Sequence, residues 1–296
     1  MKFYSRWVSG LLRNISPLNR IVAKLAFLAN VTPSGNTVDS NVWGGAQALN
    51  YDFQRRIVEI SKSLRIEKVI EPIVEFSRFG NQFDSGYVMA HDFNENDALI
   101  SLGVGNDVTL DAELSKIISK VHFYDHTVAD LPQAVRNAVF HKEEIGYVNK
   151  GSVTLEETLA RLNPAGDTIL KMDIEGSEWE VLANTVSLGT FKQIVIEFHG
   201  LRQLINQDYF VRTASALRKI HLTHAPVHLH ANNYVPVAII GNSLVPDVIE
   251  VTYLNRSIYK TVLHEPPPGS EFDSPNCSLL PEIALSFPLS SRFDFI

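Results

Sequence analysis

Short apolar runs alternate with amphipathic stretches through the middle of this chain, and this alternation restricts the possible folds more than any other feature. The apolar runs are short and rich in branched or aromatic residues, so we expect buried strands at 98–102, 121–124, 168–172 and 194–198. Leucine and isoleucine at helical spacing predict helices around 110–118, 155–162, 178–182 and 209–217. Strands separated by helices form βαβ units, so the sequence predicts an α/β fold with a mostly parallel sheet.

Two further strands are expected at 227–230 and 248–253, and only a loop separates them. A connection without a helix favours an antiparallel final strand. A helix is expected at 50–67, before the alternation begins. Residues 261–296 hold six of the fourteen prolines. We therefore predict three parts: an N-terminal helical extension (1–65), a main domain (66–260) and a Pro-rich tail (261–296).

The balance of charge disfavours a nucleic-acid partner. The chain has 26 Lys and Arg against 33 Asp and Glu, a net charge of −7, whereas general nucleic-acid binders usually carry a basic surface. Residues 1–30 have five basic and no acidic residues. This stretch is partly amphipathic and could make peripheral contact with an anionic membrane. The alternative is a helical extension that packs on the domain with its charges in solvent.

Cysteine usage and hydropathy bear on localisation. Cys277 is the single cysteine, so the chain closes no internal disulfide and has no Cys-based zinc site. A reducing compartment fits, and we expect the protein to be cytoplasmic. No run of eighteen apolar residues is present, which makes a spanning helix unexpected.

A glycine-containing segment, Ser101-Leu102-Gly103-Val104-Gly105-Asn106-Asp107, follows the first strand of the series. Gly103 and Gly105 allow a tight turn and a close approach of the backbone to a ligand. Asp125 ends the next strand, where an acidic side chain can accept hydrogen bonds from both ribose hydroxyls. Ligands of open α/β sheets bind at the carboxyl ends of the strands, so the pair predicts a bound adenine nucleoside.

The electrostatics of this loop distinguish between nucleoside cofactors. A dinucleotide site has a third glycine and a helix N-terminus free for the pyrophosphate. Here Asp107 falls near the third-glycine position, and Asp111 lies in the first helical turn. Carboxylates would repel a pyrophosphate but tolerate the sulfonium and ammonium of S-adenosylmethionine, which is the cofactor we predict. A nicotinamide-dependent oxidoreductase or epimerase is the alternative.

Acidic and histidine side chains gather at the ends of the later strands. The turn after 168–172 carries four acids, Asp173, Glu175, Glu178 and Glu180, of which the last two can stabilise a helix N-terminus. Trp179 in the same turn is expected to pack in the core. Glu197 and His199 are two apart on one strand and share a face, as do His228 and His230 on the next.

Several of these segments resemble the FkbM-type methyltransferases, which depend on S-adenosylmethionine. The resemblance covers residues 79–256 and rests on Gly80-Asn81-Gln82-Phe83-Asp84-Ser85-Gly86-Tyr87-Val88, Gly103-Val104-Gly105-Asn106-Asp107, Phe123-Tyr124-Asp125-His126-Thr127, Lys171-Met172-Asp173-Ile174-Glu175-Gly176-Ser177-Glu178-Trp179, Glu197-Phe198-His199-Gly200 and His230-Ala231-Asn232-Asn233. It implies the Rossmann-like class I methyltransferase fold, with a seven-stranded sheet whose last strand is antiparallel. It also implies O-methylation, often of sugar or polyketide hydroxyls.

Combining residues and resemblance, we expect a cofactor site formed by Ser101, Gly103, Gly105, Asp107, Asp125 and His126. Acceptor contacts are expected from Tyr87, His230, Asn232 and Asn233.

Methyl transfer to a hydroxyl needs a base, for which Asp173 and His199 are the candidates, with Glu175 positioning substrate or cofactor. A divalent metal held by Asp173, Glu197 and His199 could instead acidify the hydroxyl. A non-catalytic binding member of the fold is a further alternative. The acceptor and the oligomeric state stay open.

Overall fold

A computed structural model describes residues 43–147, 151–235, 237–240, 243–264, 271–283 and 285, with side chains from 52 onwards except at 239. The basic stretch at 1–30, for which membrane contact is expected, lies outside the described residues. Within the described part, no helix is long and apolar enough to cross a membrane.

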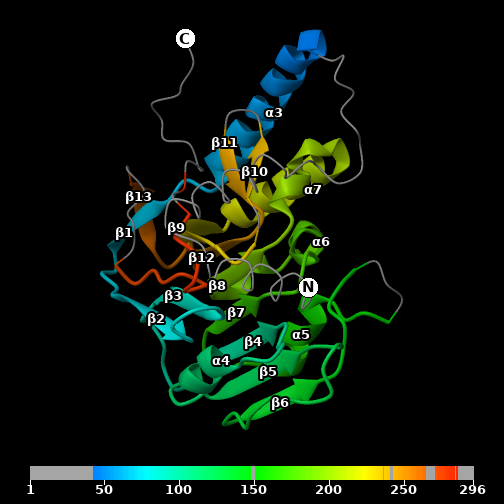
Figure 1. The fold of residues 1–296 in the computed structure, drawn as a ribbon. Coiled ribbons are helices and arrows are strands. Elements are labelled where there is room, and N and C mark those ends of the chain that lie inside the picture. The colour runs from blue at the N-terminus through cyan, green and yellow to red at the C-terminus, as the bar shows by residue number, and fades with distance from the viewer. Residues whose placement is uncertain are drawn as a thin grey trace.

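A seven-stranded sheet forms the centre of the molecule, with strand order β6-β5-β4-β7-β8-β12-β9 (Figure 1). Its strands are β4 (Ala98–Leu102), β5 (Lys120–Tyr124), β6 (Ala138–His141), β7 (Thr168–Met172), β8 (Phe191–Phe198), β9 (His224–Ala231) and β12 (Ile249–Asn255). From β6 to β8 all neighbours are parallel. The strand β12 lies antiparallel between β8 and β9. This confirms the predicted sheet with an antiparallel last strand; β6 is the strand that the apolar pattern missed.

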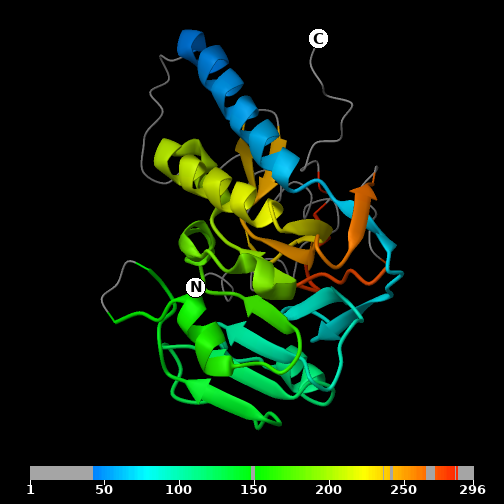
Figure 2. The ribbon, with the colours of Figure 1, turned by 180° about the vertical axis from the view of Figure 1, so that it is seen from behind.

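Helices cover both faces of this sheet because its strands are apolar on both sides. The helices are α3 (Trp43–Ser63), α4 (Thr109–Leu114), α5 (Leu155–Leu162), α6 (Glu178–Asn184) and α7 (Gln207–His221), with short 3₁₀ turns η1 (Leu188–Thr190) and η2 (Leu201–Ile205). The helix α3 lies beside α7 in both views (Figures 1 and 2). Side chains of α3, α5, α6 and α7 share one core cluster, and those of α4 belong to a second cluster.

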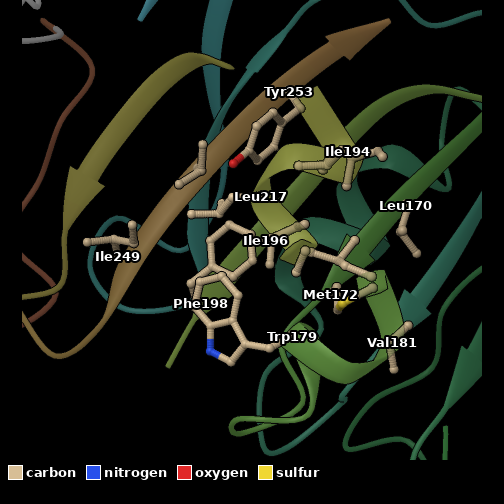
Figure 3. Close-up of a cluster of buried hydrophobic side chains, with 14 of the residues drawn as sticks. Leu170, Met172, Trp179, Val181, Ile194, Ile196, Phe198, Leu217, Ile249 and Tyr253 are labelled. Atoms are coloured by element: carbon tan, nitrogen blue, oxygen red, sulfur yellow. The ribbon is translucent and has the colours of Figure 1, made fainter. Parts of the chain in front are cut away.

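The larger core cluster packs the sheet against α6 and α7 (Figure 3). Trp179 from α6 stacks on Phe198 at the end of β8, with ring centroids 4.3 Å apart and planes 12° apart. Its indole nitrogen donates to the backbone oxygen of His199. Trp179 is therefore a packing residue, as expected, and it also holds the chain at the point where β8 ends.

Three two-stranded sheets surround the central one. They pair β1 (Glu67–Glu71) with β13 (Lys260–Leu263), β2 (Phe76–Gly80) with β3 (Gly86–Ala90), and β10 (Val237–Ile240) with β11 (Ser243–Pro246). The β2–β3 hairpin packs on α4 through Phe79 and Tyr87, which share the second core cluster with Leu110 and Leu114. Apolar alternation in these segments is weak, so the sequence pattern did not predict them.

Candidate active site

The glycine loop between β4 and α4 is tightly constrained at its first glycine. Gly103 has a φ of 82°, and a Cβ there would lie 1.7 Å from the backbone oxygen of Asp173. Its own oxygen accepts a hydrogen bond of 2.9 Å from the Lys171 ammonium. At Gly105, by contrast, φ is 55° and a Cβ would meet no atom within 4 Å. The loop is therefore fastened to β7 at Gly103 and borders open space at Gly105.

Asp125 ends β5 and holds the same loop from the other side. One carboxylate oxygen accepts from the backbone N–H groups of Val104 (2.9 Å) and Gly105 (3.2 Å). The other accepts from the backbone N–H and the hydroxyl of Thr127 at 2.7 and 2.6 Å. Burial raises the pKa of Asp125, but these hydrogen bonds outweigh it and hold the pKa below its usual value. Asp125 is an ionised carboxylate that fixes the glycine loop.

The other predicted cofactor residues differ in whether they lie at the surface of the glycine loop or beneath it. Asp107 accepts from the Asn81 amide at 3.0 Å and from the Thr109 backbone, so it joins the loop to the β2–β3 turn. His126 is exposed beside Asp125. Ser101 has no exposed surface, because it points inward from β4. The structure thus brings Asp107 and His126 to the loop surface and leaves Ser101 beneath it.

The acidic turn after β7 folds around Glu178. This side chain is fully buried, and one of its oxygens accepts from the backbone N–H groups of Ile174 and Gly176 at 3.0 and 3.1 Å. Glu175, at a φ of 55°, is 70% exposed at the tip of the turn. Asp173, at the start of the turn, has a side chain that is 27% exposed. Glu178 therefore shapes the turn, and Asp173 and Glu175 face outward from it.

His199 lies in the middle of these carboxylates. Its Nδ1 is 3.1 Å from Glu178, and its Nε2 is 3.7 Å from Glu175 and 3.9 Å from Asp173. Burial lowers the pKa of His199, but the hydrogen bond to Glu178 and the charges of Glu178, Glu197 and Asp173 outweigh it and raise the pKa to about 10. His199 is therefore an imidazolium at neutral pH and has no free lone pair with which to act as a base.

Asp173 is the more suitable base on electrostatic grounds. Burial raises its pKa to about 6, against the opposing influence of Lys171 and His199. A carboxylate with a pKa close to neutral is ionised at pH 7 yet can still accept a proton. Glu197, deeper in the sheet, has its pKa raised by burial and by the charge of Asp173.

Glu197 forms a buried network with two of the predicted acceptor residues, Asn232 and Tyr87. The Asn232 amide donates to Glu197 at 2.8 Å, and the Tyr87 hydroxyl donates to its other oxygen at 3.4 Å. Both partners are almost fully buried, at 4% and 2% exposure. Asn233 instead donates to the backbone oxygens of Cys277, Leu280 and Pro281 and accepts from the Cys277 N–H. Its amide is occupied by the C-terminal segment in this arrangement.

A metal ion could be held near this cluster by a set that differs from the predicted one. Among the described residues, ligand atoms of Asp173, Glu178 and His199 lie within 4.8 Å of one another. Glu178 takes the place that the sequence assigned to Glu197, because Glu197 is turned toward Asn232 and Tyr87. A metal-assisted mechanism stays an untested alternative to Asp173 as the base.

Sequence reasoning did not place three residues in the site that the geometry brings there. Lys171 was part of the family motif, but its contact with Gly103 depends on two strands being neighbours. Glu178 was interpreted as a helix-terminus acid, and its contact with His199 depends on the end of β8. Glu250 stands directly opposite Glu197 in the β8–β12 pairing, which no local pattern indicates.

Comparisons with solved structures find methyltransferases at low similarity. A dimethyladenosine transferase from Plasmodium falciparum matches with a TM-score of 0.34 and 13% identity over 56% of this chain and 58% of its own. The N-methyltransferase NodS from Bradyrhizobium japonicum WM9 matches with a TM-score of 0.32 and 8% identity over 74% and 99% of the two chains. These scores carry no argument about activity. No curated protein matches the sequence.

The sheet order, with its antiparallel β12 and its glycine loop after β4, defines a class I methyltransferase fold. The sequence places the chain in one family within this fold class. The model of the methyltransferase FkbM domain matches residues 53–224, more than half of the chain, and the protein belongs to this methyltransferase family. The match includes the glycine loop, Asp125, the acidic turn and His199.

Proposed function

We propose that the protein transfers a methyl group from S-adenosylmethionine to a hydroxyl of a small-molecule or glycan acceptor, with Asp173 as the base. The observation that carries the proposal is the position of Asp173. It directly follows β7, its backbone oxygen lies against Gly103, and its carboxylate faces His199. One residue therefore adjoins both the cofactor loop and the polar cluster at the end of β8.

The residues around the glycine loop fit S-adenosylmethionine. Open space at Gly105 leaves room for a ligand against the backbone. Asp107 and Asp125 have pKa values below their usual range despite burial, because of hydrogen bonds to their carboxylates, and both are anionic. Negative charge suits a cationic cofactor and opposes a pyrophosphate. In this structure the Thr127 hydroxyl donates a hydrogen bond to the Asp125 carboxylate, so a ribose hydroxyl would have to replace it.

When bound, S-adenosylmethionine supplies a methyl group on a positively charged sulfur, which is open to in-line attack. The protein must hold the acceptor oxygen in line and remove its proton as the new bond forms. Asp173 takes this proton in our proposal. The His199 imidazolium lowers the pKa of Asp173 and so keeps it ionised before the reaction. Glu178 in turn holds His199 in place through Nδ1.

Calorimetry with the full-length protein tests the cofactor part of this proposal. We expect S-adenosylmethionine and S-adenosylhomocysteine to bind, and NAD and NADP to show no binding under the same conditions. Mass spectrometry of small molecules that co-purify with the protein provides an independent check. Micromolar binding of a nicotinamide dinucleotide, with none of S-adenosylmethionine, would overturn the assignment.

Three further expectations stay proposals. They are the division into an extension (1–65), a methyltransferase domain (66–260) and a tail (261–296), the cytoplasmic location, and the absence of a nucleic-acid partner.

A further inference from the structure

Residues 271–283, which we term the strap, lie across the carboxyl end of the sheet beside β9 and β12 (red in Figure 1). Two histidines of β9 fasten it. His228 Nε2 is 2.8 Å from Asp273, and His230 Nε2 is 3.2 Å from Glu282. Between these two contacts, Asn233 exchanges hydrogen bonds with the strap backbone at Cys277 and Leu280. The strap is therefore docked on the sheet at three points.

The strap covers acidic side chains that lie next to the cluster of Asp173 and His199. Glu197 lies 4.0 Å from His199 Nε2, and Glu250 stands opposite Glu197 in the β8–β12 pairing. Asn276 of the strap donates to Glu250 at 2.5 Å and to Asp84 at 3.3 Å. The strap thus covers a polar cluster that reaches from Glu197 through Glu250 to Asp84 in the β2–β3 turn, which Asn81 joins to the glycine loop.

Asn276 has a buried hydrogen-bond acceptor with no partner. Its side chain is 4% exposed, and within the described part of the chain its Oδ1 contacts no donor. Native structures rarely leave such a group unpaired, and each case calls for an explanation. Because the Asn276 amide lies between two carboxylates, a ligand hydroxyl or ammonium that donates to Oδ1 would complete the network.

The charges around Asn276 limit which ligands fit. Asp84 and Glu250 present oxygen atoms there, and the cation His230 is held between Glu250 and Glu282. These oxygens accept hydrogen bonds from hydroxyls and ammonium groups. A phosphate or carboxylate on the ligand would meet like charge in a partly desolvated site, which is costly.

We propose that the strap is the acceptor-side wall of the active site, and that Asn276 is a specificity-determining residue that accepts a hydrogen bond from a neutral or cationic, hydroxyl-bearing acceptor. This inference rests on the proposed methyl transfer and narrows its acceptor to uncharged or amino-bearing polyols. Because Oδ1 of Asn276 has no contact with solvent in this arrangement, the strap has to move to admit the acceptor and then closes over it.

The test uses the full chain saturated with S-adenosylhomocysteine and three probes of matched size: methyl glucoside, glucosamine and glucose 6-phosphate. Binding is measured by ligand-detected NMR titration. The variant is Asn276→Ala. The matched control is Leu279→Ala, in the same strap, whose side chain is 67% exposed. A series of monodeoxy methyl glucosides identifies the hydroxyl that Asn276 contacts.

We expect the neutral and cationic probes to bind and the phosphate to bind at least about 10-fold more weakly. Asn276→Ala should weaken methyl glucoside about 3- to 10-fold, the effect of one neutral hydrogen bond, while leaving one deoxy analogue unchanged. Leu279→Ala should match the wild type. A purely structural role for Asn276 would weaken every analogue equally and would overturn the inference.

Equal binding of glucose 6-phosphate, or no binding of any probe, would also overturn it. Calorimetry with S-adenosylhomocysteine separates the two levels of the argument. If that ligand fails to bind the wild type, the proposed function fails. If it binds and the sugars do not, only the inference about the strap and Asn276 fails.

Discussion

Replacing Asp173 by asparagine should lower activity and raise stability at the same time. The substitution keeps the shape of the side chain and removes its charge. If Asp173 is the base, turnover should fall about 100-fold or more, the usual contribution of a positioned proton acceptor. Binding of S-adenosylmethionine should change far less, because the Gly103 and Asp125 contacts remain.

The gain in stability follows from the pKa of Asp173. Burial raises the pKa from 3.8 to about 6, so ionising this carboxyl costs about 3 kcal/mol more in the folded protein than in the unfolded chain. A raised carboxyl pKa means that folding favours the protonated form. Its stabilising contribution is complete below pH 3.8 and is lost as the pH rises through about 6. An uncharged asparagine avoids that loss.

Thermal and urea unfolding at several pH values measure this difference. The advantage of Asp173→Asn should grow by about 1.4 kcal/mol between pH 5 and pH 8 and then level off, with a higher Tm at pH 8. Activity is measured as transfer of labelled methyl to the acceptor. Full activity in the variant would refute the base assignment, and a stability difference independent of pH would refute the electrostatic reasoning.

The remaining predictions concern the glycine loop, the ribose contact, the strap and the metal. Gly103→Ala should destabilise the fold by about 3 kcal/mol or more, because the methyl group would lie 1.7 Å from a backbone oxygen. Gly105→Ala should fold but bind S-adenosylmethionine more weakly. Urea unfolding measures the first effect and calorimetry the second. Asp125→Asn should reduce cofactor affinity about 10- to 150-fold by calorimetry, and unchanged affinity would exclude a ribose role. Burial lowers the pKa of His230, but the hydrogen bond to Glu250 and its charge outweigh this and raise the pKa to about 9. The stabilisation by the His230 imidazolium, which also contacts Glu282 of the strap, is therefore complete below pH 6.5 and is lost as the pH rises through about 9. Hydrogen exchange of the strap should quicken in that range beyond the intrinsic rate. Treatment with EDTA should leave activity intact. A loss of activity that an added divalent cation reverses would instead favour the metal mechanism over Asp173 alone.

Local patterns in the sequence were sufficient for the main architecture. Apolar runs such as 168–172 form strands because a strand that is buried on both faces requires mostly apolar side chains on each of them. The helices between these strands impose parallel pairing. The short strand β6, with half-exposed residues, has no such signal and was missed. The glycine loop and the acidic turn were recognisable for a related reason, since two closely spaced glycines and a dense run of acids are visible within a few residues of sequence, and both glycines do take a positive φ.

The chemical state of the site depended on contacts between distant segments. The sequence by itself determined that Asp173 and His199 follow neighbouring strands, but not that Glu178, Glu197 and Asp173 would surround the imidazole and raise its pKa to about 10. Similarly, His230 and Asn233 were identified as site residues, yet their contacts with the strap join residues 44 to 52 positions apart. Charge and burial act through space, so a proton's location and the partner of an amide are properties of the packed structure rather than of any local stretch of sequence.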